Sequence, residues 1–141
     1  MASTPPKSDV RTSMSAVVLR AARKLAVNVE GELQEPGLGI DHWLAMDSLA
    51  ASAGLTMAEL QALTLTPGPT LTRIVDRLVA QSLAYREVDA VDRRKVRVYL
   101  SDRGIAAHRR MIVMVGAAEA QWAEDERDEL RAAIDQALPI A

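Results

Sequence analysis

The sequence predicts a mainly helical domain of the α+β class, with its elements in the order α-α-α-α-β-β-α-α. Hydrophobic residues make up 49% of the 141 residues, but aromatic residues only 3%, and phenylalanine is absent. This composition favours helices that pack through aliphatic side chains. Apolar residues recur at three- and four-residue steps along most of the chain, whereas residues 96–100 alternate with period two. The length suits one domain that buries its own core.

The first part of the chain is expected to hold a tail and two helices. Residues 1–9 are rich in Ser, Thr, Pro and Lys, which favours a disordered tail. Residues 11–34 carry apolar side chains at helical spacing and predict one long amphipathic helix. The sequence EPGLG at residues 35–39 ends this helix. Asp41 is placed to cap a second helix over residues 42–52.

Two further helices begin at recognisable start signals. Thr56 and Glu59 have the spacing of a capping box, in which each side chain accepts a hydrogen bond from the other residue's amide. A short helix is therefore expected over residues 57–63. Thr66 followed by Pro67 repeats the signal, with a hydroxyl cap and a proline at the first helical position. It predicts a helix over residues 67–81.

The remainder predicts a hairpin and two helices. Residues 83–88 and 96–100 are rich in strand-forming residues, and the polar segment 89–95 between them reads as the tip of a hairpin. Ser101 is placed to cap a helix over residues 102–122. The acidic run AEDERDE at residues 123–129 is typical of a helix start and predicts a separate final helix.

Charge is distributed unevenly along the chain. Residues 73–110 hold ten basic and five acidic side chains, whereas residues 111–141 hold two basic and seven acidic ones. The formal net charge is only −2. A basic middle segment favours contact with an anion, although surface charge that serves solubility alone gives the same pattern. The sequence contains no cysteine, which excludes disulfides, thiolate metal sites and cysteine catalysis.

The helix over residues 67–81 has two different faces. Leu71, Ile74, Val75 and Leu78 form an apolar face that would hold the helix on the domain. Small, hydroxyl and cationic side chains lie on the other side, and they suit the major groove of DNA. These candidate DNA-binding residues are Thr66, Pro69, Thr70, Thr72, Arg73 and Arg77. An ordinary amphipathic surface helix is the alternative, and the basic hairpin that follows argues against it.

The hairpin tip ends in three consecutive cations, Arg93, Arg94 and Lys95. An arginine at such a tip can enter the narrow, electronegative minor groove. Asp92 is better suited to pair with one of these arginines, so that the tip keeps its shape. The alternative is a solvated hairpin whose charges only maintain solubility.

The segment TLTRIVDRLVAQSLAYREVDAVDRRKVRVYLSDRG resembles the recognition helix and wing of MarR-type winged-helix transcriptional regulators. The resemblance rests on Thr70–Arg73, Val75–Leu78, Arg86 with Asp89, Asp92–Arg94, and Leu100-Ser101 followed by Gly104. It implies a homodimer with interlocking terminal helices, a palindromic DNA site and often a small aromatic or phenolic ligand that weakens DNA binding. By motif position, Thr70, Thr72, Arg73 and Arg77 would face the major groove. Arg93 or Arg94 would enter the minor groove, and Asp92 and Arg86 would brace the wing.

The chain departs from the family pattern in two places. Ser82 stands just after the recognition helix, where the family usually has glycine. A residue there needs a left-handed backbone, which serine adopts less easily than glycine. The absence of cysteine excludes the thiol-based peroxide sensing of some relatives. Neither departure affects the candidate DNA-binding residues.

Other candidate residues carry weaker signals. His42, Trp43 and Met46 could line an effector pocket, although residues at this spacing are more often part of the core. His108 is expected at an interface or on the surface. The sequence offers no catalytic constellation, no metal site and no phosphate-binding loop, so we expect neither an enzyme nor a cofactor.

The apolar stripes of the first and last helices lie outside the winged-helix segment and must be covered. A two-fold partner covers them and sets two recognition helices about 34–36 Å apart, one turn of DNA. We therefore assign residues 10–35 and 102–141 to a dimerisation region and residues 36–101 to DNA binding. The start lacks an apolar signal segment and no run is long enough for a membrane span, so a cytoplasmic, nucleoid-associated protein is expected.

The sequence thus predicts a dimeric, double-stranded DNA-binding regulator, and repression is implied by the resemblance alone. The alternative is a winged-helix interaction module that docks an acidic protein partner through its basic hairpin without reading DNA sequence.

Overall fold

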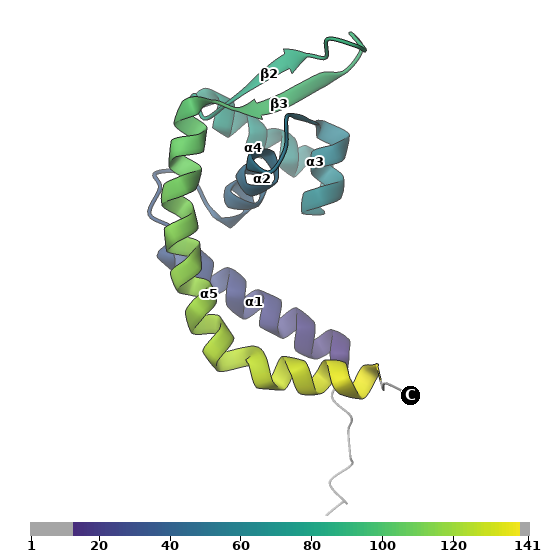
Figure 1. Ribbon diagram of the computed structural model, residues 1–141, viewed down its shortest axis with the longest axis vertical. Helices are drawn as coiled ribbons and strands as arrows, with labels where there is room; N and C mark the ends of the chain where they lie inside the picture. The colour runs from purple at the N-terminus through teal and green to yellow at the C-terminus, as the bar shows by residue number, and fades with distance from the viewer. Residues whose placement is uncertain (1–12, 139–141) are drawn as a thin grey trace, which may run out of the picture.

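The computed structural model describes residues 13–138 and confirms a mainly helical winged-helix fold. The expected tail at residues 1–9 lies outside the described part. The elements are α1 (Met14–Glu32), α2 (Ile40–Ala50), β1 (Leu55–Thr56), α3 (Met57–Thr64), α4 (Gly68–Ala80), β2 (Ala84–Val88), β3 (Val96–Leu100) and α5 (Asp102–Ala137). In Figure 1, α2, α3, α4 and the hairpin form a compact head, and α1 lies beside the far half of α5.

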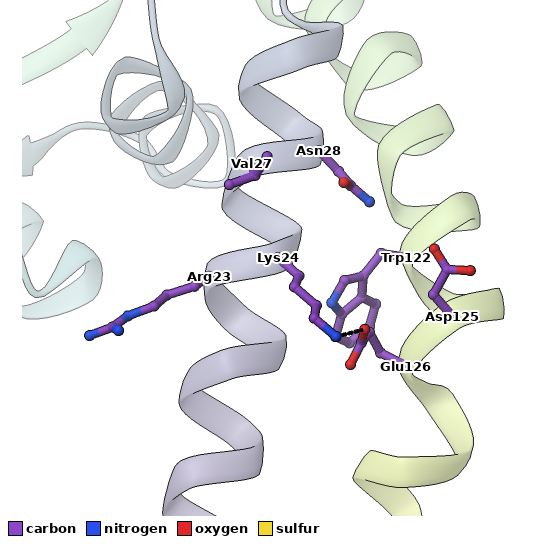
Figure 2. A pocket seen from close by; sticks show the side chains of 7 residues that line it. All are labelled: Arg23, Lys24, Val27, Asn28, Trp122, Asp125 and Glu126. Atoms are coloured by element: carbon purple, nitrogen blue, oxygen red, sulfur yellow. Dashed lines mark hydrogen bonds and ion pairs between the residues drawn. The ribbon is translucent and has the colours of Figure 1, made fainter.

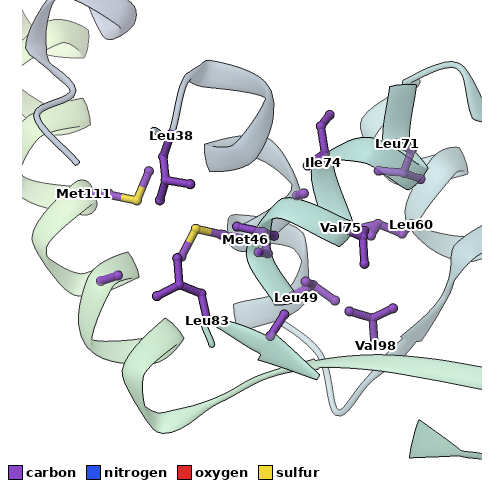
Figure 3. Close-up of a cluster of buried hydrophobic side chains, with 14 residues drawn as sticks. Leu38, Met46, Leu49, Leu60, Leu71, Ile74, Val75, Leu83, Val98 and Met111 are labelled. Atoms are coloured by element: carbon purple, nitrogen blue, oxygen red, sulfur yellow. The ribbon is translucent and has the colours of Figure 1, made fainter. Parts of the chain in front are cut away.

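The core of the head is aliphatic, as the composition predicts. The predicted inner face of α4, Leu71, Ile74, Val75 and Leu78, is buried in full. It packs with Met46 of α2, Leu60 of α3 and Val98 of β3, among others (Figure 3). Met111 of α5 belongs to the same cluster. The head is therefore continuous with the first part of the long helix through one apolar core.

The sheet has three antiparallel strands in the order β1-β3-β2. Strands β2 and β3 form the predicted hairpin, with Arg86 opposite Val98 and Val88 opposite Val96. The short strand β1 was not predicted, because two residues are too few to show a period. It lies beside β3 and places Thr56 opposite Arg97 at the start of α3.

Two of the predicted helix starts are confirmed and two need correction. The Thr56–Glu59 capping box forms with hydrogen bonds of 3.2 and 3.1 Å, and Ser101 Oγ caps α5 by accepting from the Gly104 amide. Asp41 does not cap α2. The helix begins at Ile40, and the Nδ1 atom of His42 accepts from the Gly39 amide instead.

The start of α4 also differs from the prediction. Pro67 is the N-cap residue and Pro69 occupies the first turn, so the helix begins one residue later than expected. Thr66 makes no cap. Its hydroxyl donates to the Thr64 carbonyl at 3.5 Å, and the residue is buried. Proline still marks the start because it presets a helical φ without losing a helical hydrogen bond.

Ser82 adopts the left-handed backbone expected after α4, with φ 59°. Its amide donates to Val79, and the next amide, Leu83, donates to Leu78 over 2.8 Å, which is the Schellman pattern. The Ser82 carbonyl accepts a 2.6 Å hydrogen bond from Ser101 Oγ. Gly104 is required nearby, because a Cβ there would overlap the Leu83 carbonyl oxygen. The turn thus holds the hairpin close to the start of α5.

The C-terminal region is one helix of 36 residues rather than the two predicted. Residues 117–137 contain no glycine or proline, and their Ala, Glu, Arg and Leu side chains favour continued helix. The acidic run is therefore part of a continuous helix, which bends in Figure 1. Most of its acidic residues are exposed, but Glu126 is buried and pairs with Lys24 of α1. No helix of the described residues is long and apolar enough to cross a membrane.

Candidate nucleic-acid interface

The outer face of α4 is open to solvent where the sequence predicts DNA contacts. Pro69, Thr72, Arg73 and Arg77 are exposed, and Thr70 is half-buried. Thr66 differs because it is buried, so it offers less surface than the other candidates. In this state Thr72 donates to the Gly68 carbonyl at 3.0 Å, and Arg73 Nε donates weakly to the Pro69 carbonyl. Both groups bond only to the first turn of their own helix and are free to exchange these partners.

Arg77 lies in different surroundings from Arg73, one turn away. A Cβ placed on Gly37, in the segment between α1 and α2, would overlap the Arg77 Nη2 atom. The positive charge of Arg77 also contributes to lowering the pKa of His42, after burial, which is the larger cause. The Arg77 guanidinium therefore lies against the segment before α2 and near His42.

The hairpin tip, residues 89–95, presents Arg93, Arg94 and Lys95 to solvent. Asp92 accepts from the Arg94 amide at 3.1 Å and from Arg94 Nε at 3.2 Å. The predicted pairing of Asp92 with a tip arginine is thus present, and the hydrogen bonds from Arg94 lower the pKa of Asp92. Arg93 and Lys95 make no ion pair among the described residues. The tip is a shaped loop with a dense positive charge.

Asp89 organises the tip more than the sequence predicts. Its Oδ1 atom accepts from the amides of Val91 and Asp92 at 2.7 and 3.0 Å, and its Oδ2 atom pairs with Arg97 Nε. The Arg97 side chain and these two amides lower the pKa of Asp89 to about 2. An aspartate followed by two tip residues is a signal for such a turn. Its pairing with Arg97 depends on the strand register, which the sequence leaves open.

Arg97 and Arg86 connect the hairpin to two different helices. Arg97 Nη1 lies 3.3 Å from the Glu59 carboxylate at the start of α3. Arg86 Nη2 lies 2.5 Å from Asp76 Oδ1 on α4. Arg86 thus ties strand β2 to α4 rather than contacting the tip. Together the two arginines fix the orientation of the hairpin relative to α3 and α4.

The three candidate effector residues have different surroundings. Met46 is fully buried in the core, and His42 uses Nδ1 to cap α2. Trp43 is half-buried and stacks on His108, with ring centroids 5.0 Å apart and planes inclined by 8°. Cavities of about 270 and 280 Å³ lie further along α5, on either side of Trp122. Figure 2 shows the first, between α1 and α5, with the Lys24–Glu126 ion pair inside it.

The fold and the exposed basic surface define a winged helix-turn-helix protein. The sequence model of the MarR family matches residues 37–95, which include α2, α3, α4, β2 and the hairpin tip. No curated protein sequence matches the chain. With the solved structures below, this match shows that the chain resembles the MarR-type winged-helix regulators and has their fold.

Solved structures match nearly the whole described fold. The apo form of MarR from E. coli has a TM-score of 0.78 and 22% identity, over 91% of this chain and 98% of that one. A mutant MarR complexed with operator DNA has a TM-score of 0.73 and 22% identity, over 89% and 94%. A MarR family regulator from Silicibacter pomeroyi gives 0.70 and 27%, over 89% and 90%.

A further structural relative is BpsR from Bordetella bronchiseptica, whose DNA binding is regulated by 6-hydroxynicotinic acid. It has a TM-score of 0.72 and 18% identity, over 86% of this chain and 96% of that one.

Proposed function

We propose that this chain is a sequence-specific repressor that binds double-stranded DNA as a homodimer on a palindromic operator in the cytoplasm. The outer face of α4 enters the major groove, and the hairpin tip follows the adjacent minor groove. Phosphate contacts supply most of the affinity, and the Thr side chains and Arg73 of α4 supply the sequence preference. The role is one of binding rather than catalysis.

The observation that carries this proposal is the arrangement of cations at the tip. Arg93, Arg94 and Lys95 are exposed together, while Asp89 and Asp92 are occupied by Arg97, Arg94 and tip amides. The nearby carboxylates thus shape the loop. A positive loop held beside an open helix face suits two adjacent grooves of a duplex.

The proposal of a dimer is supported by apolar side chains that the described part of the chain leaves uncovered. Leu19 and Val27 of α1 are 58% and 71% exposed, Val113 of α5 is 75% exposed, and Leu138, the C-cap residue of α5, is 66% exposed. A second copy that packs against α1 and α5 covers these helices and places two copies of α4 about one DNA turn apart. The acidic second half of α5 then lies away from the phosphates.

The salt dependence of duplex binding tests the proposal. The logarithm of the association constant falls linearly with the logarithm of salt concentration, with a slope of about −0.9 per phosphate contact. Replacing both Arg93 and Arg94 by alanine is expected to weaken binding and make this slope shallower by about 1 for each lost contact. Arg127→Ala is the matched control, because Arg127 is 79% exposed on the second half of α5. An unchanged slope in the double variant would overturn the DNA role of the tip and favour a protein partner.

We also propose a small aromatic effector at the junction of α2 and α5. The Trp43–His108 stack links the head to the long helix, and a flat aromatic ligand that competes for the Trp43 face would change this link. The test uses 6-hydroxynicotinic acid and salicylate as probes, with duplex release and tryptophan fluorescence as readouts. Release by neither probe, with no change in fluorescence, would count against this site for aromatic acids.

A further inference from the structure

Residues 33–39, here called the α1–α2 loop, contact both the recognition helix and α5. On one side, Gln81 Nε2 donates to the Pro36 carbonyl at 3.4 Å, and Arg77 lies against Gly37. On the other side, the Glu35 carboxylate accepts from Arg110 Nε at 2.7 Å and from Nη2 at 3.3 Å. The loop therefore joins the end of α4 to the long helix α5.

The α1–α2 loop is anchored by buried side chains, and its backbone conformation requires a glycine. The Glu35 side chain is only 12% exposed, and its hydrogen bonds raise the pKa of Arg110. Leu38 is buried in the core of the head. Gly37 has a φ of 72°, which favours glycine, and the missing Cβ leaves room for the Arg77 guanidinium. By contrast, a Cβ on Gly31 would meet nothing within 4 Å.

Arg73 and Arg77 therefore differ in role although they are one turn apart on the same helix. Arg73 bonds only to the first turn of α4 and has no contact that ties it to the α1–α2 loop. Arg77 is packed against this loop, and its charge acts on His42 of α2. A side chain that reads bases must be free to leave its partners, and Arg77 is the less free of the two.

We propose that Arg77 is a positioning residue that holds the α1–α2 loop against the recognition helix and so sets the spacing of the two reading heads. This inference rests on the proposed function. In a dimer built on α1 and α5, each head is joined to the shared body through its α1–α2 loop and α5. The contacts of Arg77 and Gln81 on one side, and of Glu35 on the other, hold the angle of α4 relative to that body.

The test measures binding to one inverted repeat with the spacer between half-sites lengthened or shortened by single base pairs. Each added pair rotates a half-site by about 34–36° and moves it by about 3.4 Å. The preference for the best spacer is the ratio of the affinity for that spacer to the affinity for the altered spacers. This ratio is expected to be about fivefold or more smaller in Arg77→Ala than in the wild type. The salt slope and the base preference within each half-site are expected to stay as in the wild type.

Arg73→Ala is the matched control on the same helix. It is expected to change the salt slope or the base preference while the best spacer stays the same. The inference is overturned if Arg77→Ala loses preference at one base of each half-site. It is also overturned if Arg77→Ala makes the salt slope shallower by about 1 per protomer, since that identifies a phosphate contact.

Hydrogen exchange on the free protein separates this inference from the proposed function. The backbone amides of Glu35 and of residues 37–39 are expected to exchange faster in Arg77→Ala than in the wild type or in Arg73→Ala. Equal exchange of these amides in all three proteins overturns the positioning role of Arg77, independently of the results of the DNA-binding experiments. If the wild type binds no duplex but the loop amides still exchange faster in Arg77→Ala, the proposed function is overturned. The contact of Arg77 with the α1–α2 loop is then still established.

Discussion

His108 of α5 lies face to face with Trp43 of α2, with ring centroids 5.0 Å apart. The His108 Nε2 atom also lies 3.0 Å from Asp47 Oδ1, on the same helix as Trp43. The sequence placed His108 at an interface or on the surface, and the structure buries it between the head and the long helix. One imidazole thus joins the two parts by stacking and by a polar contact.

Replacing His108 by alanine is therefore expected to destabilise the fold. The variant loses an aromatic stack and a hydrogen bond and leaves a gap beside Trp43, which together cost about 1–3 kcal/mol. Chemical denaturation followed by tryptophan fluorescence measures this loss. Arg109→Ala, at an exposed neighbouring position, is the control and is expected to unfold like the wild type. A variant as stable as the wild type would show that the stack contributes nothing.

His42 predicts a pH dependence near neutrality. Burial, and then the charge of Arg77, lower its pKa below 6.5. The folded state therefore binds this proton less readily than the unfolded state, so stability is full above about pH 6.5 and falls below it. Protonation also removes the Nδ1 acceptor that caps α2. The midpoint temperature should fall between pH 7 and pH 5.5 in the wild type, and fall less in His42→Gln.

The same measurement of midpoint temperature against pH, made on Arg77→Ala, tests the contribution of the Arg77 charge to the lowered pKa of His42. Removing the guanidinium removes one of the two causes that lower the pKa of His42, so the pH dependence should be weaker than in the wild type. A pH profile identical to that of the wild type would indicate that Arg77 is too far from His42 to act on it.

Asp89 is expected to be required for the shape of the hairpin tip. Asp89→Asn loses the ion pair with Arg97 and weakens the hydrogen bonds from the tip amides. The tip must then become ordered on binding, which lowers the affinity for duplex severalfold. The overall fold is expected to stay the same. Binding assays at two salt concentrations, with circular dichroism for the fold, check this. Glu87→Gln, two residues away on β2, serves as control, and equal losses in both variants would contradict the special role of Asp89.

Acid titration gives a second readout for Asp89. Its pKa of about 2 lies below the usual value of 3.8, so its contribution to stability is present above about pH 3.8 and is lost as pH falls toward 2. Asp89→Asn should lack this part of the acid dependence. The comparison is made from unfolding midpoints between pH 4 and pH 2.

The assembly prediction concerns the exposed apolar side chains of α1. Leu19→Glu is expected to shift the protein from dimer to monomer, because it places a charge in an interface that would otherwise be apolar. Leu63→Glu on α3 is the matched control, since Leu63 is 62% exposed and lies outside the helices assigned to dimerisation. Analytical ultracentrifugation measures both. A Leu19→Glu protein that stays dimeric would place the interface elsewhere.

Local signals in the sequence were sufficient for most of the fold. The Thr56–Glu59 capping box, the hairpin over residues 84–100 and the apolar face of α4 each depend on neighbours within a few residues. The left-handed backbone of Ser82 was expected from the family resemblance, because the family usually has glycine at this position. These features are decided by backbone geometry and hydrogen bonding over short range, which the residue pattern records directly.

What the sequence could not supply depends on contacts between distant residues. The pairing of Asp89 with Arg97, the stack of Trp43 on His108 and the contact of Arg77 with Gly37 all require the tertiary fold. The acidic run in α5 was misread as a helix start, because acidic residues also favour the exposed surface of a continuing helix. The DNA-binding residues stay a prediction, resting on the open face of α4 and the shaped basic tip.

In-vitro selection from a random duplex library, with the wild-type protein at near-physiological salt, tests the central claim most directly. The account predicts enrichment of an inverted repeat whose half-sites are about 10 base pairs apart, centre to centre. Binding that falls steeply with salt but enriches no sequence would contradict specific reading by a dimer, and would leave only a basic surface suited to an acidic partner.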